Sequence, residues 1–191
     1  MTIKTKKGVS EVIATVFLIL LTVAAVVALI SFIKPFTEKN LGDSTECLPF
    51  INFYKFQEYF SNSSGNYIYN CYQSKPSSTL IGATVKTGTN LSTDDMEKLD
   101  GFVLLFSDDS ESKSVNLTNG KVSSGGIGDI WRIGQPNSQL AINKPNEVIT
   151  YVYNSSKSFS KLDVYPLLKN GRICEKTDSL KIKSCAGVSL T

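Results

Sequence analysis

The sequence predicts an α+β protein, with a long apolar N-terminal helix followed by an antiparallel β-sandwich head. An uncharged, apolar run extends from Val12 to Ile33. Beyond about Cys47, short apolar runs alternate with stretches of Ser, Asn, Thr and Gly, as in half-buried strands joined by turns. With 191 residues, the chain is long enough for one such helix and one domain of ordinary size. We expect a leader peptide, the helix and the head, spanning residues 1–8, 9–45 and 46–191.

The apolar run is long enough to cross a membrane. A helix from Val12 to Ile33 is about 33 Å long, and the apolar core of a bilayer is about 30 Å thick. Its residues are mainly Val, Ile, Leu, Ala and Phe, so it has no polar face for water. Lys4, Lys6 and Lys7 precede it, and the positive-inside rule then places the N-terminus in the cytoplasm and the head outside.

Three interpretations of this N-terminal segment compete. A cleaved secretory signal peptide has a shorter apolar region, followed by a small-residue cleavage site that this sequence lacks. A plain signal anchor explains the hydropathy by itself. The third interpretation depends on residues 6–15, KKGVSEVIAT, which resemble the class III signal peptide of archaeal type IV pilins.

The resemblance covers about residues 6–36 and implies a processing site. In that family a dedicated prepilin peptidase cuts after the glycine, so the processing residues here are Lys6, Lys7, Gly8 and Val9. Cleavage between Gly8 and Val9 leaves the whole apolar helix on the mature subunit. A glycine also suits a scissile bond, because it leaves the backbone unhindered and disfavours a continuous helix.

Glu11 is the acidic residue at the start of the apolar run, and two roles for it remain open. A carboxylate there interacts favourably with the helix dipole, by about 0.3–1 kcal/mol. In a filament it would instead assist assembly, by pairing with the α-amino group of its own or an adjacent subunit. Bacterial pilins place a carboxylate farther along the helix, so the role of that residue does not transfer directly to Glu11.

The resemblance implies a structural role. The chain would be a subunit of an extracellular type IV pilus-like filament, a helical homopolymer on the cell surface. Its partners would be copies of itself, the prepilin peptidase, an assembly ATPase and a membrane platform protein, with the membrane holding the precursor. Two alternatives are a minor pseudopilin or adhesive tip subunit, and a single-pass, membrane-anchored surface protein whose head binds a ligand.

The composition argues against other function classes. The chain has 20 basic and 17 acidic residues, and loss of the three leader lysines would make these numbers equal. No basic stripe with interleaved aromatic residues then remains for nucleic acid. Histidine is absent, so the usual general base and the commonest metal ligand are missing. We therefore expect no enzyme, no metal site and no cofactor.

The region after the apolar run predicts a helix end and many strands. Pro35 falls where the run ends, and the mixed residues after it predict a kinked continuation to about Gly42. The pair Asn170-Gly171 is the strongest hairpin signal, whereas residues 94–98 are expected to form a loop. The expected strands are 50–56, 67–72, 80–86, 102–107, 114–117, 148–153, 161–167, 172–174 and 180–183.

The cysteines predict disulfides. Cys47, Cys71, Cys174 and Cys185 all follow the apolar run, and none lies in a CxxC motif. An exported head lies in an oxidising compartment, although reduced core thiols are the alternative. Of the three possible connectivities, we favour Cys47 with Cys71 and Cys174 with Cys185, because each closes a local loop.

Several loops of the head have candidate functions. The N-x-S/T glycosylation acceptors are Asn62, Asn90, Asn116 and Asn154, where sugars would cover the outer surface. The acidic residues at 94–95 and 108–111 lack the spacing of a calcium-binding loop and predict solvated loops. The run SSGGIG at 123–128 lacks the end of a phosphate-binding P-loop and predicts a flexible or adhesive surface loop.

Overall fold

The computed structural model describes residues 8–62, 65–89 and 91–191, with the side chains of 8–12, 32–44 and 60–66 left out. It divides into two compact units that meet in sequence between Glu46 and Cys47. The first is an apolar N-terminal helix and the second is a β-rich domain, so the α+β class is confirmed.

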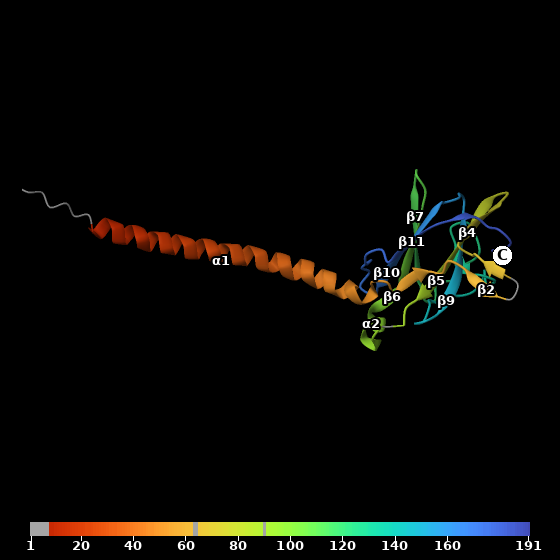
Figure 1. Ribbon diagram of the computed structural model, residues 1–191, viewed down its shortest axis with the longest axis horizontal. Coiled ribbons are helices and arrows are strands. Elements are labelled where there is room, and N and C mark those ends of the chain that lie inside the picture. Colours follow the sequence, from red (N-terminus) through yellow and green to blue (C-terminus); the bar gives the residue numbers. More distant parts are fainter. Residues whose placement is uncertain (1–7, 63–64, 90) are drawn as a thin grey trace, which may run out of the picture. The chain divides into compact units, whose positions relative to one another are not determined.

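The helix α1 extends from Gly8 to Cys47 and has 40 residues. Figure 1 shows it as one helix without interruption. It continues through Pro35 and ends beyond Gly42, so the sequence placed its end too early. Pro49 explains the observed end, because a proline has no amide hydrogen and disfavours helical backbone in the residue before it. The chain turns there into the short 3-10 helix η1, Leu48–Phe50.

The β-rich domain contains two larger sheets. The first, with the order β12-β4-β5-β9-β8 and β1 paired to β5, consists of β1 (Tyr54–Phe56), β4 (Cys71–Lys75), β5 (Ser78–Thr87), β8 (Ile130–Arg132), β9 (Val148–Ser155) and β12 (Lys183–Ser184). The second, with the order β11-β10-β6-β7, consists of β6 (Leu99–Ser107), β7 (Ser112–Thr118), β10 (Lys161–Leu168) and β11 (Asp178–Lys181). All pairings in these sheets are antiparallel except that of β12 with β4.

The two sheets share one apolar core. Alternate residues of β5 and β9 and alternate residues of β6 and β10 are buried in the same cluster. Aromatic pairs join the sheets: the ring centroids of Phe102 and Tyr151 are 5.4 Å apart, and those of Phe106 and Tyr153 are 4.6 Å apart. Such pairs contribute about 0.5–1.5 kcal/mol beyond the burial of their area.

A second apolar cluster covers the outer face of the first sheet. It contains Leu80, Trp131, Val152 and Leu190, so Trp131 is a core residue. Gly82 allows this cover to approach, because a Cβ atom there would lie 2.0 Å from the carbonyl oxygen of Tyr69 and 2.9 Å from Leu190. Any larger residue at Gly82 would push the covering segments off the sheet.

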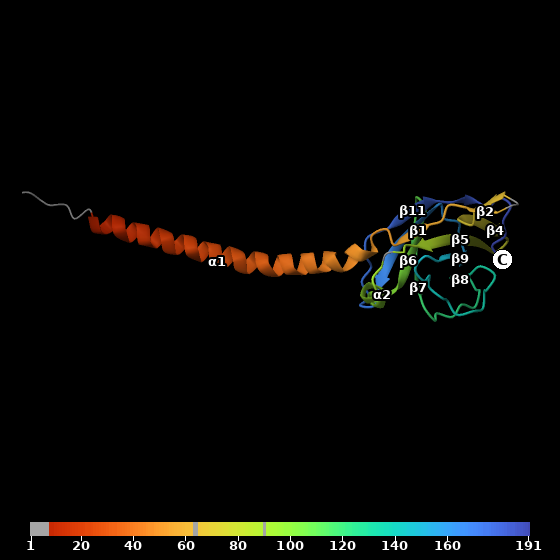
Figure 2. The same cartoon turned by 60° about the horizontal axis from the view of Figure 1, so that its bottom comes forward.

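Several local predictions are wrong. Residues 94–98 belong to a helix, α2 (Thr93–Lys98), because the Ser92 hydroxyl caps it by accepting a hydrogen bond from the Asp95 amide at 3.1 Å. Residues 172–174 form no strand and make one isolated bridge, Leu167 to Ile173. Three short strands escaped prediction: β8, β2 (Phe60–Asn62) and β3 (Gly65–Tyr67). The long connection that contains β8 is drawn from green to cyan in Figure 2.

Candidate functional site

The most unusual surface of the chain lies on α1. Its segment Ile13–Ser31 has a mean hydropathy of 3.0, and none of it is buried. The large apolar side chains from Ile13 to Ile30 are 51–71% exposed. By length and composition the segment has the character of a membrane anchor or a signal sequence.

Two polar side chains of this segment form hydrogen bonds within the helix. The Thr22 hydroxyl donates a hydrogen bond to the Ile19 carbonyl oxygen at 2.8 Å, and the Ser31 hydroxyl donates to that of Val27 at 2.8 Å. Both hydrogen atoms are thus used within the helix. This matters because an unpaired hydroxyl group in hydrocarbon costs several kcal/mol.

The structure describes the predicted processing site only in part. Lys6 and Lys7 lie outside the described residues. Gly8 and Val9 are the first residues of α1, where backbone amides have no acceptor within the helix. Glu11 lies in the first turn, and its side chain is outside the described part. The role of these residues therefore stays a prediction.

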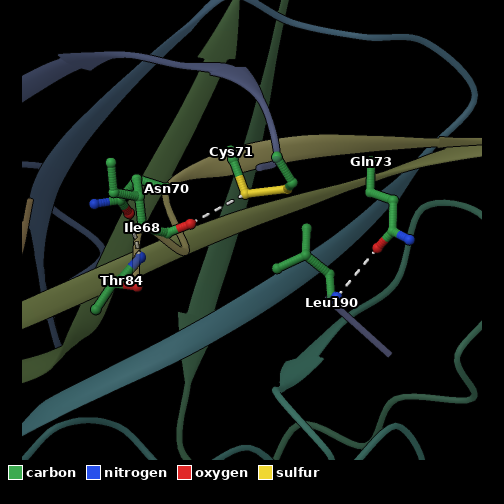
Figure 3. Close-up of a disulfide and its surroundings, with 7 residues drawn as sticks. Ile68, Asn70, Cys71, Gln73, Thr84 and Leu190 are labelled. Carbon is green, nitrogen blue, oxygen red and sulfur yellow. Dashed lines mark hydrogen bonds between the residues drawn. A yellow bond between two sulfur atoms is a disulfide. The ribbon is translucent and has the colours of Figure 1, made fainter. Parts of the chain in front are cut away.

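All four cysteines form disulfides, but the favoured pairing is wrong. Cys47 is bonded to Cys174 and Cys71 to Cys185, with sequence separations of 127 and 114. The second pair follows from strand order, because β12 runs parallel to β4 with Lys183 beside Cys71. Local loop length was therefore a poor guide. Figure 3 shows the bond at Cys71 between the strand and the crossing C-terminal segment.

The disulfide of Cys47 fixes the last residue of α1 to the β-rich domain. Cys174 is itself held in place, because its amide donates to the Pro166 carbonyl oxygen of β10 at 2.9 Å. In the chain-entropy model, a disulfide that closes a loop of this length stabilises by about 4–5 kcal/mol. The first residue of the second unit is therefore joined covalently to a residue near its C-terminal end.

The glycosylation acceptors differ in accessibility. Asn116 is exposed on β7, an edge strand of the second sheet. Asn154 is buried, and its Nδ2 atom donates to the Gly125 carbonyl oxygen at 3.2 Å. Since that nitrogen is the atom a sugar would join, the folded domain does not present Asn154 for glycosylation. The side chain of Asn62, on β2, and all of Asn90 lie outside the described residues.

The glycine-rich run at 123–128 is an ordered loop that surrounds its own anion. The Asp129 carboxylate accepts hydrogen bonds from the Ser124 amide at 2.9 Å, the Ser124 hydroxyl at 2.6 Å and the Gly126 amide at 3.1 Å. The Ser124 hydroxyl and these amides hold the pKa of Asp129 below its ordinary value. The loop is thus hydrogen-bonded to the residue that follows it, and its role as a flexible or adhesive surface loop stays a prediction.

The acidic residues make local contacts. Asp95 pairs with Lys98 at 2.9 Å, and Asp108 accepts from the amides of Ser110 and Glu111 at 2.7 and 2.9 Å. Among the described residues, no three His, Cys, Asp or Glu side chains come together as metal ligands would.

Comparison with known proteins identifies no relative: no family model, curated protein or solved structure matches the chain. Function must therefore be inferred from the residues themselves.

Proposed function

We propose that this chain is a structural subunit of a type IV pilus-like filament, cut after Gly8 and polymerised through its N-terminal helix. The main support is the segment Ile13–Ser31, which is apolar on all sides and wholly unburied. A signal sequence that is removed has no need of a continuous helix to Cys47, disulfide-bonded to the following domain.

The proposed assembly exchanges one apolar environment for another. Lipid surrounds the helix before assembly, and helices of neighbouring subunits surround it afterwards. Small residues allow such helices to approach closely. Ala14, Ala24, Ala25 and Ala28 supply them within the span.

The β-rich domain fits the exported side of such a subunit. We infer that its two sheets, which share one core, form a β-sandwich outside the cell. Disulfides persist in oxidising compartments, and both bonds lie in this domain. The leader lysines place the N-terminus in the cytoplasm. A prepilin peptidase, an assembly ATPase and a membrane platform protein complete the proposed pathway, in which the chain is no enzyme.

The decisive experiment is to identify the first residue of the mature protein in native cells by mass spectrometry. We expect it to be Val9, and Gly8→Val should abolish processing because a β-branched side chain hinders the scissile bond. Gly8→Ala, with a small side chain, is the matched control and should retain partial processing. An intact Met1, or a terminus beyond Ile33, would contradict the proposal.

A second candidate function is a membrane-anchored binding protein, and a surface pocket in the β-rich domain favours it. Shearing of cells separates the two candidates. A filament subunit with a mature Val9 terminus should appear in the sheared extracellular fraction as a polymer. A membrane-anchored protein should stay with the membrane and dissolve in detergent as separate chains.

A further inference from the structure

The β-rich domain contains a pocket of about 500 Å³ beside the Cys71–Cys185 disulfide. Ligand pockets for small molecules typically measure about 300–1,000 Å³. Its lining is mainly apolar, with contributions from Ile68, Leu180 and Ala186. Figure 3 shows Ile68, Asn70 and Cys71 side by side there, with the Cys71 sulfur 3.4 Å from the Ile68 carbonyl oxygen.

Two lysines line the same pocket because of the way the chain crosses between sheets. Lys181 ends β11 of the second sheet and Lys183 begins β12 of the first. Ile182 between them is 5% exposed and belongs to the core. Residues on either side of an inward residue of extended chain point the same way, about 7 Å apart. Burial of Ile182 therefore directs both lysines outward.

The charged side chains that line the pocket form no ion pairs with other described residues of the domain. Lys181 and Lys183 are exposed, and so is Glu58, the third charged residue of the lining. In the part of the chain that the structure describes, none of the three makes an ion pair. The Asn70 side chain of the lining is already hydrogen-bonded: it donates to the Gln57 carbonyl oxygen at 2.7 Å and accepts from the Thr84 amide at 2.6 Å. The two lysines are thus the cationic groups of the lining, and with Glu58 they leave its net charge positive.

We propose that this pocket binds a small organic carboxylate with an apolar body. The body lies against Ile68 and Ala186, and the carboxylate lies near Lys181 and Lys183, whose ammonium groups donate charge-assisted hydrogen bonds. Glu58 opposes the anion and limits its affinity. Removing the lysine charges should therefore weaken binding of the carboxylate, and removing the Glu58 charge should strengthen it.

The test is a titration of 4-fluorobenzoate, followed by ¹⁹F line broadening, with the full-length chain in neutral detergent. We expect saturable binding of 4-fluorobenzoate and at least tenfold weaker binding of the uncharged 4-fluorobenzamide. The double variant Lys181→Gln with Lys183→Gln should weaken benzoate binding at least tenfold. Glu58→Gln should strengthen it a few-fold. Lys113→Gln is the matched control, since Lys113 is an exposed lysine on β7 outside the pocket, and it should leave binding unchanged.

Non-reducing mass spectrometry of each variant, showing both disulfides, ensures that a loss of binding is not a loss of folding. Equal binding of the benzoate and the benzamide would overturn the proposal, as would wild-type affinity in the double lysine variant. The pocket would instead belong to a contact with a second copy if polymerisation protected Lys181 and Lys183 from acetylation while 4-fluorobenzoate failed to bind. That outcome also overturns it.

Discussion

Tyr54 and Tyr151 lie in the same core but differ in what surrounds their hydroxyl groups. Both side chains are fully buried, and burial raises the pKa of each well above its ordinary value. The Tyr151 hydroxyl lies 2.8 Å from Asn143 Oδ1 and 2.9 Å from the Ala141 carbonyl oxygen. The Tyr54 hydroxyl has no hydrogen-bond partner among the described residues. The Tyr151 hydroxyl is therefore hydrogen-bonded, whereas burial of the unpaired Tyr54 hydroxyl lowers the stability of the fold.

This difference predicts opposite effects of the same substitution. Tyr54→Phe should raise the free energy of unfolding by about 1 kcal/mol, because it removes an unpaired buried hydroxyl and keeps the ring. Tyr151→Phe should lower it by about 1–2 kcal/mol, because Asn143 loses its donor. Urea unfolding at neutral pH measures both. A destabilised Tyr54→Phe variant would show that its hydroxyl is paired after all.

At the scale of the element, the loop at 123–128 is hydrogen-bonded to one carboxylate. Asp129 follows the loop directly and accepts its hydrogen bonds. Gly128 connects the loop to β9, because its amide donates to the Asn154 carbonyl oxygen at 2.7 Å. The sequence shows a glycine-rich run followed by an acidic residue. It does not show that the carboxylate of this residue accepts hydrogen bonds from the run. Only the folded backbone turns those amides toward Asp129.

The order of this loop should depend on pH. The pKa of Asp129 is lowered in the folded chain from its ordinary value of 3.8. The stabilisation is therefore present above about pH 4 and is lost as the pH falls through the lowered folded-state value. It should amount to less than about 1 kcal/mol, since the carboxylate is partly solvated. The amide resonances of Ser124 and Gly126, followed by NMR from pH 6 to pH 2, should move with this titration. In Asp129→Asn they should not.

At the scale of the whole molecule, the sequence predicts composition-driven features well and tertiary ones poorly. The apolar helix needs only a run of like residues. The strands β6, β9 and β10, all within residues 99–168, follow from the alternation of apolar and polar residues along the chain. A turn does form at Asn170-Gly171, where Gly171 has a φ of +84° and its amide donates to the Leu168 carbonyl oxygen at 2.9 Å, but the second strand of the predicted hairpin is reduced to one isolated bridge. These signals are local.

The disulfide partners and the accessibility of Asn154 depend instead on which strands become neighbours. Cys71 meets Cys185 only because β12 crosses to the first sheet and lies beside β4. The sequence predicts that Asn154 is a glycosylation acceptor on the surface. In the structure its side-chain amide instead donates a hydrogen bond to the Gly125 carbonyl oxygen. The processing residues at the N-terminus stay predictions, because the proposed role depends on recognition by another protein and not on the fold.

The disulfide pairing is directly testable. A non-reducing digest should yield one peptide pair with Cys47 joined to Cys174 and another with Cys71 joined to Cys185. Replacing either pair by serine should lower the free energy of unfolding by about 2–5 kcal/mol, as is usual for native disulfides. Single substitutions are the controls, since each should cost at least as much and leave a free thiol. A Cys47–Cys71 peptide would contradict the structure.

The bond between Cys47 and Cys174 has a mechanical consequence. Traction applied along α1 reaches Cys47, where it divides between the peptide bond to Leu48 and the disulfide. Strands β1 to β10 all lie within the covalent ring that this bond closes. Tension between the helix and the segment after Cys174 therefore bypasses them. As long as the disulfide stays oxidised, such a force cannot unfold the domain by detaching its strands one after another, beginning with β1.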